Sequence, residues 1–224
     1  MRRLDVVIFD VVETLFPIEP LRARLIAAGL PGTMLETWFA SFLRDAFALE
    51  IAGRYKPFGE LAAAALARLL RARTGRAGKA DIAAVMSGFS VLDAHEDVAP
   101  AFAMLQRAGV RIAALSNGAE GVTAALFERA GLREGIAAIF SIDEVRHWKP
   151  HPDTYRHALA RLECAPDHAA LVAAHAWDIE GAHRAGLRTG YVARGNMPAH
   201  EAMDSPDVMG RTLTETVMNL LKTV

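Results

Sequence analysis

This chain of 224 residues has one cysteine, a net charge close to zero and few long apolar runs. Its single cysteine, Cys164, excludes an intrachain disulfide and indicates a reducing compartment, which we expect to be the cytoplasm. The formal net charge is −1, without a cluster of Lys and Arg, which excludes the basic surface that nucleic acids require. The first apolar run is interrupted by Asp5 and Asp10, so it is too short and too acidic for a signal peptide or a membrane span.

Two common binding motifs are also missing. No Gly-rich dinucleotide fingerprint follows the first apolar run, and no GxxxxGK phosphate loop occurs anywhere. Five histidines stand at no metal-ligand spacing, and we expect them to be mainly surface residues; they are His147, His151, His157, His168 and His183.

Apolar runs of strand length alternate with helical patterns along most of the chain. The runs span residues 4–10, 110–118, 137–145, 170–178 and 187–194. Continuous apolar strands that alternate with helices indicate a parallel sheet covered on both faces. With short gaps that suit right-handed crossovers, the sequence predicts an α/β core with a doubly wound, Rossmann-like sheet.

A long segment with few strand signals separates the first two runs. It covers residues 17–93, and its apolar residues recur at helical spacing, as Leu21 and Leu25 do. Residues 61–73 are rich in alanine and leucine, which favour helices. We therefore predict a helical cap domain of residues 17–93 over the carboxyl ends of the strands of a core domain formed by 1–16 and 94–224.

Polar residues follow the predicted strands at their carboxyl ends, which is where sheets of this kind bind ligands. They are Asp10 with Thr14, Ser116 with Asn117, Lys149, and Asp178. Taken singly, each has an ordinary structural role as a cap, a turn residue or a surface charge. An ionised aspartate after an apolar strand is costly unless it is paired. A nearby lysine would keep Asp10 a carboxylate, which can then act as a nucleophile.

Four segments carry a family resemblance. FDVVETL, LSNG, WKPHPDTY and AWDIEGAHRAG resemble, in this order, the four motifs of the haloacid dehalogenase (HAD) superfamily. The similarity extends over nearly the whole chain, including GRYKPF (53–58) in the cap. Within the superfamily the sequence most resembles the type II 2-haloacid dehalogenases. The resemblance implies a hydrolase for a small organic acid, and by analogy a homodimer.

Two acidic groups of the superfamily's phosphatases are missing. Their second aspartate, which protonates the leaving group, is replaced by Val12. Halide leaves without a proton, so a valine is compatible with dehalogenation. The segment LVAAH (171–175) lacks the carboxylate that helps to hold magnesium. We expect no metal and no cofactor, with a magnesium ion held by Asp10 and Asp178 as the alternative.

The resemblance implies roles for matching residues. Asp10 would attack the carbon that bears the halogen, Lys149 would keep Asp10 ionised, and water near Asp178 would cleave the ester. Thr14 and Ser116 would hydrogen-bond the nucleophile or the substrate carboxylate. Asn117, Tyr155 and Trp177 match positions in the pocket or directly behind it, and Leu15, Phe16 and Phe58 would form its apolar wall. We expect Phe39 at the mouth.

The cap departs from the family at a functional position. Type II dehalogenases carry an arginine directly after a tryptophan, which receives the departing halide, whereas Trp38 is followed by Phe39. Arg44 lies five residues further on and is expected to face elsewhere on the helix. His175 replaces an asparagine and either orders the hydrolytic water or packs. The alternatives are therefore a hydrolase of another small substrate, such as a phosphate ester, and a silent relative that binds a small acid.

Overall fold

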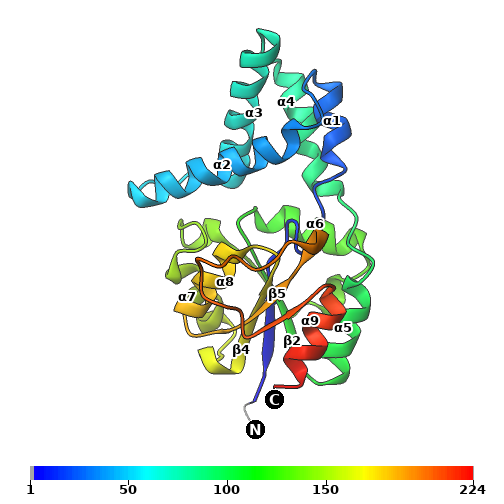
Figure 1. Cartoon of the computed structure of the whole chain (residues 1–224), viewed down its shortest axis with the longest axis vertical. Coiled ribbons are helices and arrows are strands. Elements are labelled where there is room, and N and C mark those ends of the chain that lie inside the picture. Colours follow the sequence, from blue (N-terminus) through cyan, green and yellow to red (C-terminus); the bar gives the residue numbers. More distant parts are fainter. Residues whose placement is uncertain (1–2, 224) are drawn as a thin grey trace.

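A parallel sheet forms the centre of the protein (Figure 1). The computed structural model describes residues 3–223. The strands are β1 (Val6–Phe9), β2 (Arg111–Ser116), β3 (Ala138–Ser141), β4 (Ala169–Ala173), β5 (Arg188–Val192) and β6 (Val208–Gly210). They lie in the order β3-β2-β1-β4-β5-β6, and every pairing is parallel. This order confirms the predicted doubly wound, Rossmann-like α/β core, in which β1 lies next to the point where the strand order reverses.

Two apolar cores cover the two faces of the sheet because successive strand residues point to opposite sides. Val7 and Phe9 belong to one core, and Val6 and Ile8 to the other. The first core contains residues of α5 (Val98–Arg107), α6 (Glu120–Arg129) and α9 (Leu213–Leu221). The second contains residues of α7 (Pro152–Arg161) and α8 (Ala176–Arg184). Burial on both faces explains why the strands are apolar throughout.

Helices stand above the sheet, as Figure 1 shows. They are α1 (Leu21–Ala27), α2 (Met34–Ile51), α3 (Phe58–Thr74) and α4 (Lys79–Met86), followed by the 3₁₀ turn η1 (Ser87–Val91). The helix α2 buries Leu35, Trp38 and Phe42 at helical spacing. Among the described residues, the segment 17–93 forms helices and turns and no named strand. None of the helices within residues 3–223 has the length and apolar character to cross a membrane.

The chain differs from the sequence prediction in its C-terminal part. Neither β6 nor α9 was predicted, and the apolar run 170–178 ends as a strand at Ala173, before α8 begins at Ala176. Further 3₁₀ turns are η2 (Arg133–Gly135), η3 (Ile142–Glu144), η4 (Pro166–His168) and η5 (Arg194–Asn196).

Candidate active site

Asp10 is the first residue after β1, and its position is set by the sheet. Its backbone N–H donates to the carbonyl of Val172 on β4, at 3.0 Å. The turn that follows brings Thr14 back, and the Thr14 hydroxyl donates to Asp10 Oδ2 at 2.6 Å. Thr14 Oγ1 also accepts from the N–H of Ala174, at 2.9 Å. One hydroxyl therefore fixes the Asp10 carboxylate and ties the turn to the end of β4.

The Lys149 side chain joins the two predicted acidic residues. Its Nζ lies 2.8 Å from Asp10 Oδ1, 2.7 Å from Asp178 Oδ2 and 3.0 Å from the carbonyl of Leu115. The three ammonium hydrogens therefore all have acceptors. The side chain of Lys149 is fully buried, so these acceptors compensate the loss of its hydration.

Asp178 lies in the first turn of α8, where the helix dipole favours a negative charge. The Tyr155 hydroxyl donates to its Oδ1 at 2.6 Å, and Lys149 binds the other oxygen. Asp178 and Tyr155 are both fully buried. Tyr155 therefore holds the Asp178 carboxylate in place from within the core.

The pKa values of the two carboxyl groups move apart. Burial alone would raise the pKa of Asp10, but the charge of Lys149 and the hydrogen bond from His175 outweigh it and hold the pKa well below its usual range. Burial, together with the charge of Asp10, raises the pKa of Asp178 despite Lys149. The pKa of Lys149 is raised because the two carboxylates outweigh its burial. Asp10 is therefore the more acidic group and Asp178 the more basic one.

His175 contacts the Asp10 oxygen that Lys149 does not bind. Its Nδ1 lies 3.1 Å from Asp10 Oδ2. An ionised carboxylate only accepts hydrogen bonds, so Nδ1 carries a hydrogen in this contact. The imidazole lies nearly parallel to the rings of Trp177 and Phe39, with centroid distances of 4.9 and 6.4 Å. His175 therefore both contacts Asp10 and packs against two aromatic rings.

A small cavity of about 20 Å³ opens beside Asp10. Its lining contains several predicted site residues, namely Asp10, Phe39, Phe58, Ser116, Asn117, His175 and Trp177, together with Val12, Leu43 and Gly118. Leu43 and Gly118 were not predicted. Leu43 lies four residues after Phe39 on α2, and this spacing, which places both on one face of the helix, is the signal that could have found it.

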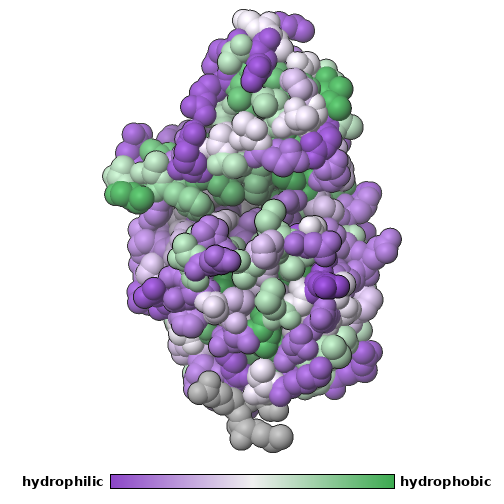
Figure 2. Space-filling model, viewed as in Figure 1, coloured by the Kyte–Doolittle hydropathy of each residue, from purple (hydrophilic) through white to green (hydrophobic). Residues whose placement is uncertain are grey.

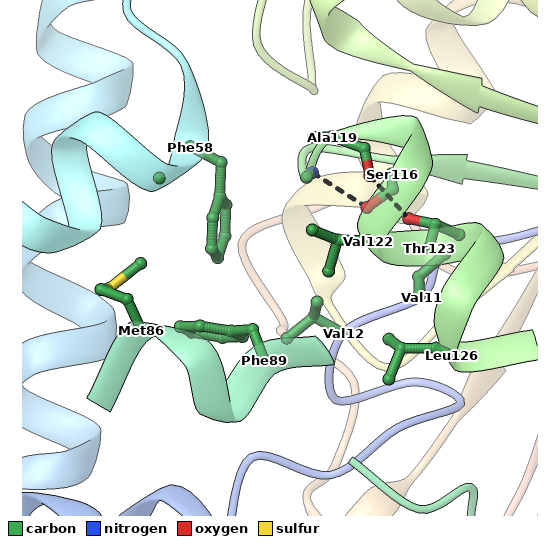
Figure 3. A pocket seen from close by; sticks show the side chains of 12 residues that line it. Val11, Val12, Phe58, Met86, Phe89, Ser116, Ala119, Val122, Thr123 and Leu126 are labelled. Carbon is green, nitrogen blue, oxygen red and sulfur yellow. Dashed lines mark hydrogen bonds between the residues drawn. The ribbon is translucent and has the colours of Figure 1, made fainter. Parts of the chain in front are cut away.

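A larger apolar cavity of about 120 Å³ adjoins the first one (Figure 3). The two share four lining residues, which are Val12, Phe58, Ser116 and Gly118. Figure 3 shows Phe58, Met86 and Phe89 on the side of the helical segment, and Val122 and Leu126 of α6 on the opposite side.

Two predicted pocket residues lie elsewhere. Leu15 and Phe16 were expected to form the apolar wall, but neither lines the cavity beside Asp10. Both are fully buried, and Phe16 packs edge-on against Phe127 of α6, with 5.5 Å between ring centroids. Because the turn that carries Thr14 back to Asp10 directs the next two side chains into the core, the prediction for Leu15 and Phe16 was wrong.

Three other predicted residues have specific partners. Ser116 Oγ accepts from the N–H of Gly118 at 2.9 Å. Asn117 Oδ1 accepts from the backbone N–H of Lys149 at 3.2 Å and so holds the segment that carries the lysine. Arg44 is mostly exposed and pairs with Asp45, which confirms that it faces away from the position of Phe39.

The ammonium of Lys149 bridges the two acidic residues that were considered for magnesium. Asp10 Oδ1 and Asp178 Oδ2, the pair considered for magnesium, are both bonded to Lys149 Nζ. A hard divalent cation needs several oxygen ligands, whereas an ammonium group here already neutralises both carboxylates. The described residues at this point do not fit a magnesium site.

Two of the histidines expected at the surface form a cluster with a carboxylate. His147 and His151 lie together with Glu50, and one ligand atom from each of the three is within 4.8 Å of the others. Glu50 is the second-last residue of α2 and distant in sequence. The five-residue segment HWKPH was the only local signal of this cluster.

The doubly wound sheet, the helices inserted after β1 and the lysine-held aspartate define a HAD-type α/β hydrolase. A sequence model of the haloacid dehalogenase-like hydrolases matches residues 4–186, and the chain belongs to this family. An (S)-2-haloacid dehalogenase of Xanthobacter autotrophicus is 29% identical over 194 residues, which are 85% of this chain and 76% of the relative. (S)-2-haloacid dehalogenase 1 of Pseudomonas sp. (strain CBS-3) is 27% identical, with 85% of each chain covered. The solved structure of the L-2-haloacid dehalogenase from Xanthobacter autotrophicus superposes with a TM-score of 0.90 at 25% identity, covering 99% of this chain and 100% of that one.

Proposed function

We propose that the protein hydrolyses the carbon–halogen bond of a small 2-haloacid. The observation that carries the proposal is the Asp10 carboxylate, held ionised by Lys149 at the edge of a small cavity. Val12 lines that cavity where phosphatases of the superfamily place an acid, which suits a leaving group that needs no proton. The similarity to (S)-2-haloacid dehalogenases supports the same reaction.

In the first step, an oxygen of Asp10 attacks C2 of the substrate from the side opposite to the halogen. The new C–O bond forms as the carbon–halogen bond breaks, so the halide leaves with the bonding electrons and C2 is inverted. The enzyme now carries an ester at Asp10. The hydroxyl of Ser116 and the amide of Asn117, which line the cavity, are placed to bind the substrate carboxylate.

His175 takes the place of the missing arginine as the group that receives the halide. It is the one basic side chain in the described lining of the Asp10 cavity. Ester formation removes the negative charge of Asp10, which Lys149 and the Nδ1–H of His175 contact in the free enzyme. These donors then no longer pair with a carboxylate at Asp10, which favours departure of the halide anion.

In the second step, water attacks the carbonyl carbon of the Asp10 ester. Asp178 accepts the proton of the water, a role that its raised pKa favours. Thr14 and Lys149 donate to the Asp10 oxygens and stabilise the tetrahedral intermediate. The 2-hydroxy acid leaves with an original oxygen of Asp10 and takes the proton that Asp178 accepted, which restores Asp178. Asp10 is regenerated with an oxygen from water and releases the second hydrogen of that water as a proton.

The domain organisation and the oligomeric state are inferred by analogy with the dehalogenases, and the location from the cysteine content. We infer that residues 17–93 act as a cap domain over a core of 1–16 and 94–224, and that two copies pair through the cap. Ile51 at the end of α2 is 89% exposed, and Figure 2 shows a hydrophobic surface at the end of this helix. The single cysteine supports a cytoplasmic location.

Halide release from (S)-2-chloropropionate and chloroacetate in the presence of EDTA tests the function. Hydrolysis of an aryl phosphate with magnesium is measured in parallel, with Asp10→Asn as the control for both. We expect chloride release that EDTA does not reduce and that Asp10→Asn abolishes. Phosphate release without chloride release would replace the proposal with a phosphatase, and the absence of both would indicate a silent relative.

A further inference from the structure

The larger apolar cavity extends the site away from Asp10. It adjoins the Asp10 cavity, and Val12 and Phe58 line both. The Asp10 cavity has a volume of about 20 Å³, whereas the adjoining cavity has a volume of about 120 Å³. A substrate bound at Asp10 therefore has room for additional carbon atoms in this direction.

The lining of the larger cavity favours one chemical class of group. Its side chains are almost all apolar and come from both the helical segment and the core: Phe58, Met86 and Phe89 face Val122 and Leu126 (Figure 3). The hydroxyls of Ser116 and Thr123 are partly used by hydrogen bonds to Gly118 and Ala119. Away from Ser116, a charged or polar group here would lose its hydration and gain few hydrogen-bond partners.

From these two observations, and on the basis of the proposed function, we infer that the larger cavity binds an unbranched alkyl chain at C2 of the substrate. The preferred substrates are then 2-haloacids longer than 2-halopropionate. Each methylene group that enters an apolar site gains about 0.8 kcal/mol, equivalent to roughly a fourfold rise in kcat/KM.

The test is a chain-length series of (S)-2-bromo acids, from propionate to hexanoate, with the wild type and Val122→Phe. Val122 lines the cavity and is 36% exposed, so a larger side chain there fills the cavity without disturbing the core. Val91→Phe is the matched control, because Val91 is similarly exposed and is not among the described residues that line the cavity.

We expect kcat/KM to rise along the series in the wild type and in Val91→Phe. In Val122→Phe the rise is lost, while 2-bromopropionate is turned over within about twofold of the wild-type rate. A flat wild-type series, or an equal loss on all substrates in Val122→Phe, would overturn this inference and leave the proposed function standing. No bromide release from any acid would overturn the proposed function itself.

A second inference rests on the cluster of Glu50, His147 and His151 and is independent of the reaction. The imidazoles of His147 and His151 lie nearly parallel with 4.0 Å between their centroids. Glu50 Oε1 lies 2.6 Å from His147 Nδ1, and Glu50 Oε2 accepts from the N–H of Trp148 at 2.8 Å. One carboxylate therefore already contacts the segment that carries both histidines.

The geometry points to a binding site for a zinc-like divalent cation. Imidazole nitrogens with one carboxylate oxygen are a common zinc ligand set, with three protein ligands and a fourth position open. Here the ligand atoms lie within 4.8 Å of one another, and both histidines are partly exposed, so an ion can enter. Glu50 is on α2, and His147 and His151 flank Lys149, so the bound cation links the helical segment to the core beside the active site.

Calorimetric titration of Zn²⁺ into the chelator-free protein tests the site. We expect one Zn²⁺ per chain and a higher thermal midpoint in Zn²⁺ than in EDTA. His147→Gln and His151→Gln should each weaken Zn²⁺ binding at least tenfold, while His183→Gln, a partly exposed histidine outside the cluster, should not. Midpoints in EDTA show whether each variant is folded. No stoichiometric binding by the wild type, or equal weakening in His183→Gln, would overturn the inference.

Discussion

Lys149 Nζ lies 2.8 Å from Asp10 Oδ1, and neither side chain is more than 6% exposed. The same nitrogen binds Asp178 Oδ2 at 2.7 Å, so a single ammonium serves two carboxylates. Because both carboxyl groups are buried, each depends on this charge to remain ionised.

Lys149→Met should therefore abolish the reaction. Without the ammonium, the pKa of Asp10 rises and the nucleophile is lost, so we expect kcat to fall by at least about 10²-fold. Removing one partner of a buried ion pair also costs on the order of 3–5 kcal/mol of folding stability. Steady-state kinetics and urea unfolding measure the two effects. Wild-type activity in a folded Lys149→Met protein would contradict the role of the lysine.

The pH dependence should separate the two carboxyl groups. The pKa of Asp10 is lowered, so Asp10 stays ionised through the range in which the enzyme is assayed. The pKa of Asp178 is raised, so Asp178 loses its function as a base, by protonation, at a higher pH than an ordinary aspartate. We expect ester hydrolysis to slow as the pH falls, while ester formation continues.

Rapid quenching followed by mass spectrometry of the intact protein can check this separation. The ester should accumulate at low pH in the wild type and at all pH values in Asp178→Asn. If neither condition increases the ester, the proton acceptor of the second step is another group.

The halide acceptor can be tested by exchanging residues across the Asp10 cavity. Phe39 and His175 face each other, with 6.4 Å between their ring centroids. We expect His175→Gln to lower kcat about 10- to 100-fold, and the added change Phe39→Arg to restore part of the loss by supplying a new cation. Phe39→Met in the same background is the matched control, and equal rescue by methionine would exclude the charge as the cause.

A second ion pair supports the turn that carries Thr14. Arg194 donates to both oxygens of Asp97, at 2.7 and 2.9 Å, and to the carbonyl of Thr14. Asp97 Oδ2 also accepts from the N–H of Leu213 at the start of α9, at 2.7 Å. The pair thus connects the active-site turn to the C-terminal helix.

Asp97→Asn should destabilise the fold by about 1–3 kcal/mol at pH 7. Burial would raise the pKa of Asp97, but Arg194 and the N–H of Leu213 lower it. A lowered pKa adds stability above the ordinary aspartate pKa of about 4, and this stability is lost as the pH falls below that value. Urea unfolding of wild type and variant from pH 7 to pH 2 should therefore converge at low pH. The exposed Asp93→Asn is the control, and an equal change there would refute the specific role of Asp97.

The sequence was most informative where a pattern of residues has a single physical explanation. Continuous apolar runs located β1 to β5, because strands covered on both faces contain few polar residues. The polar residues after those runs met at one edge, as parallel strands require, and this placed Asp10, Lys149 and Asp178 together. The strand β6 has three residues, of which only Gly210 is buried, and no apolar run, so nothing in the pattern marked it.

Relationships that depend on how a turn directs side chains, or on distant segments, could not be predicted. Leu15 and Phe16 are adjacent to Thr14 in sequence, but the turn points them into the core. Glu50 reaches His147 only because the end of α2 packs against the segment before Lys149, a contact between residues 97 apart in sequence.

The most direct test of the account is a single turnover of (S)-2-chloropropionate in H₂¹⁸O with excess enzyme. If Asp10 forms the ester and water attacks its carbonyl carbon, the first lactate carries unlabelled oxygen in its hydroxyl group. The ¹⁸O then appears in the peptide that contains Asp10. Label in the first lactate with an unlabelled peptide would mean that water attacks the substrate directly, and would contradict the covalent role of Asp10.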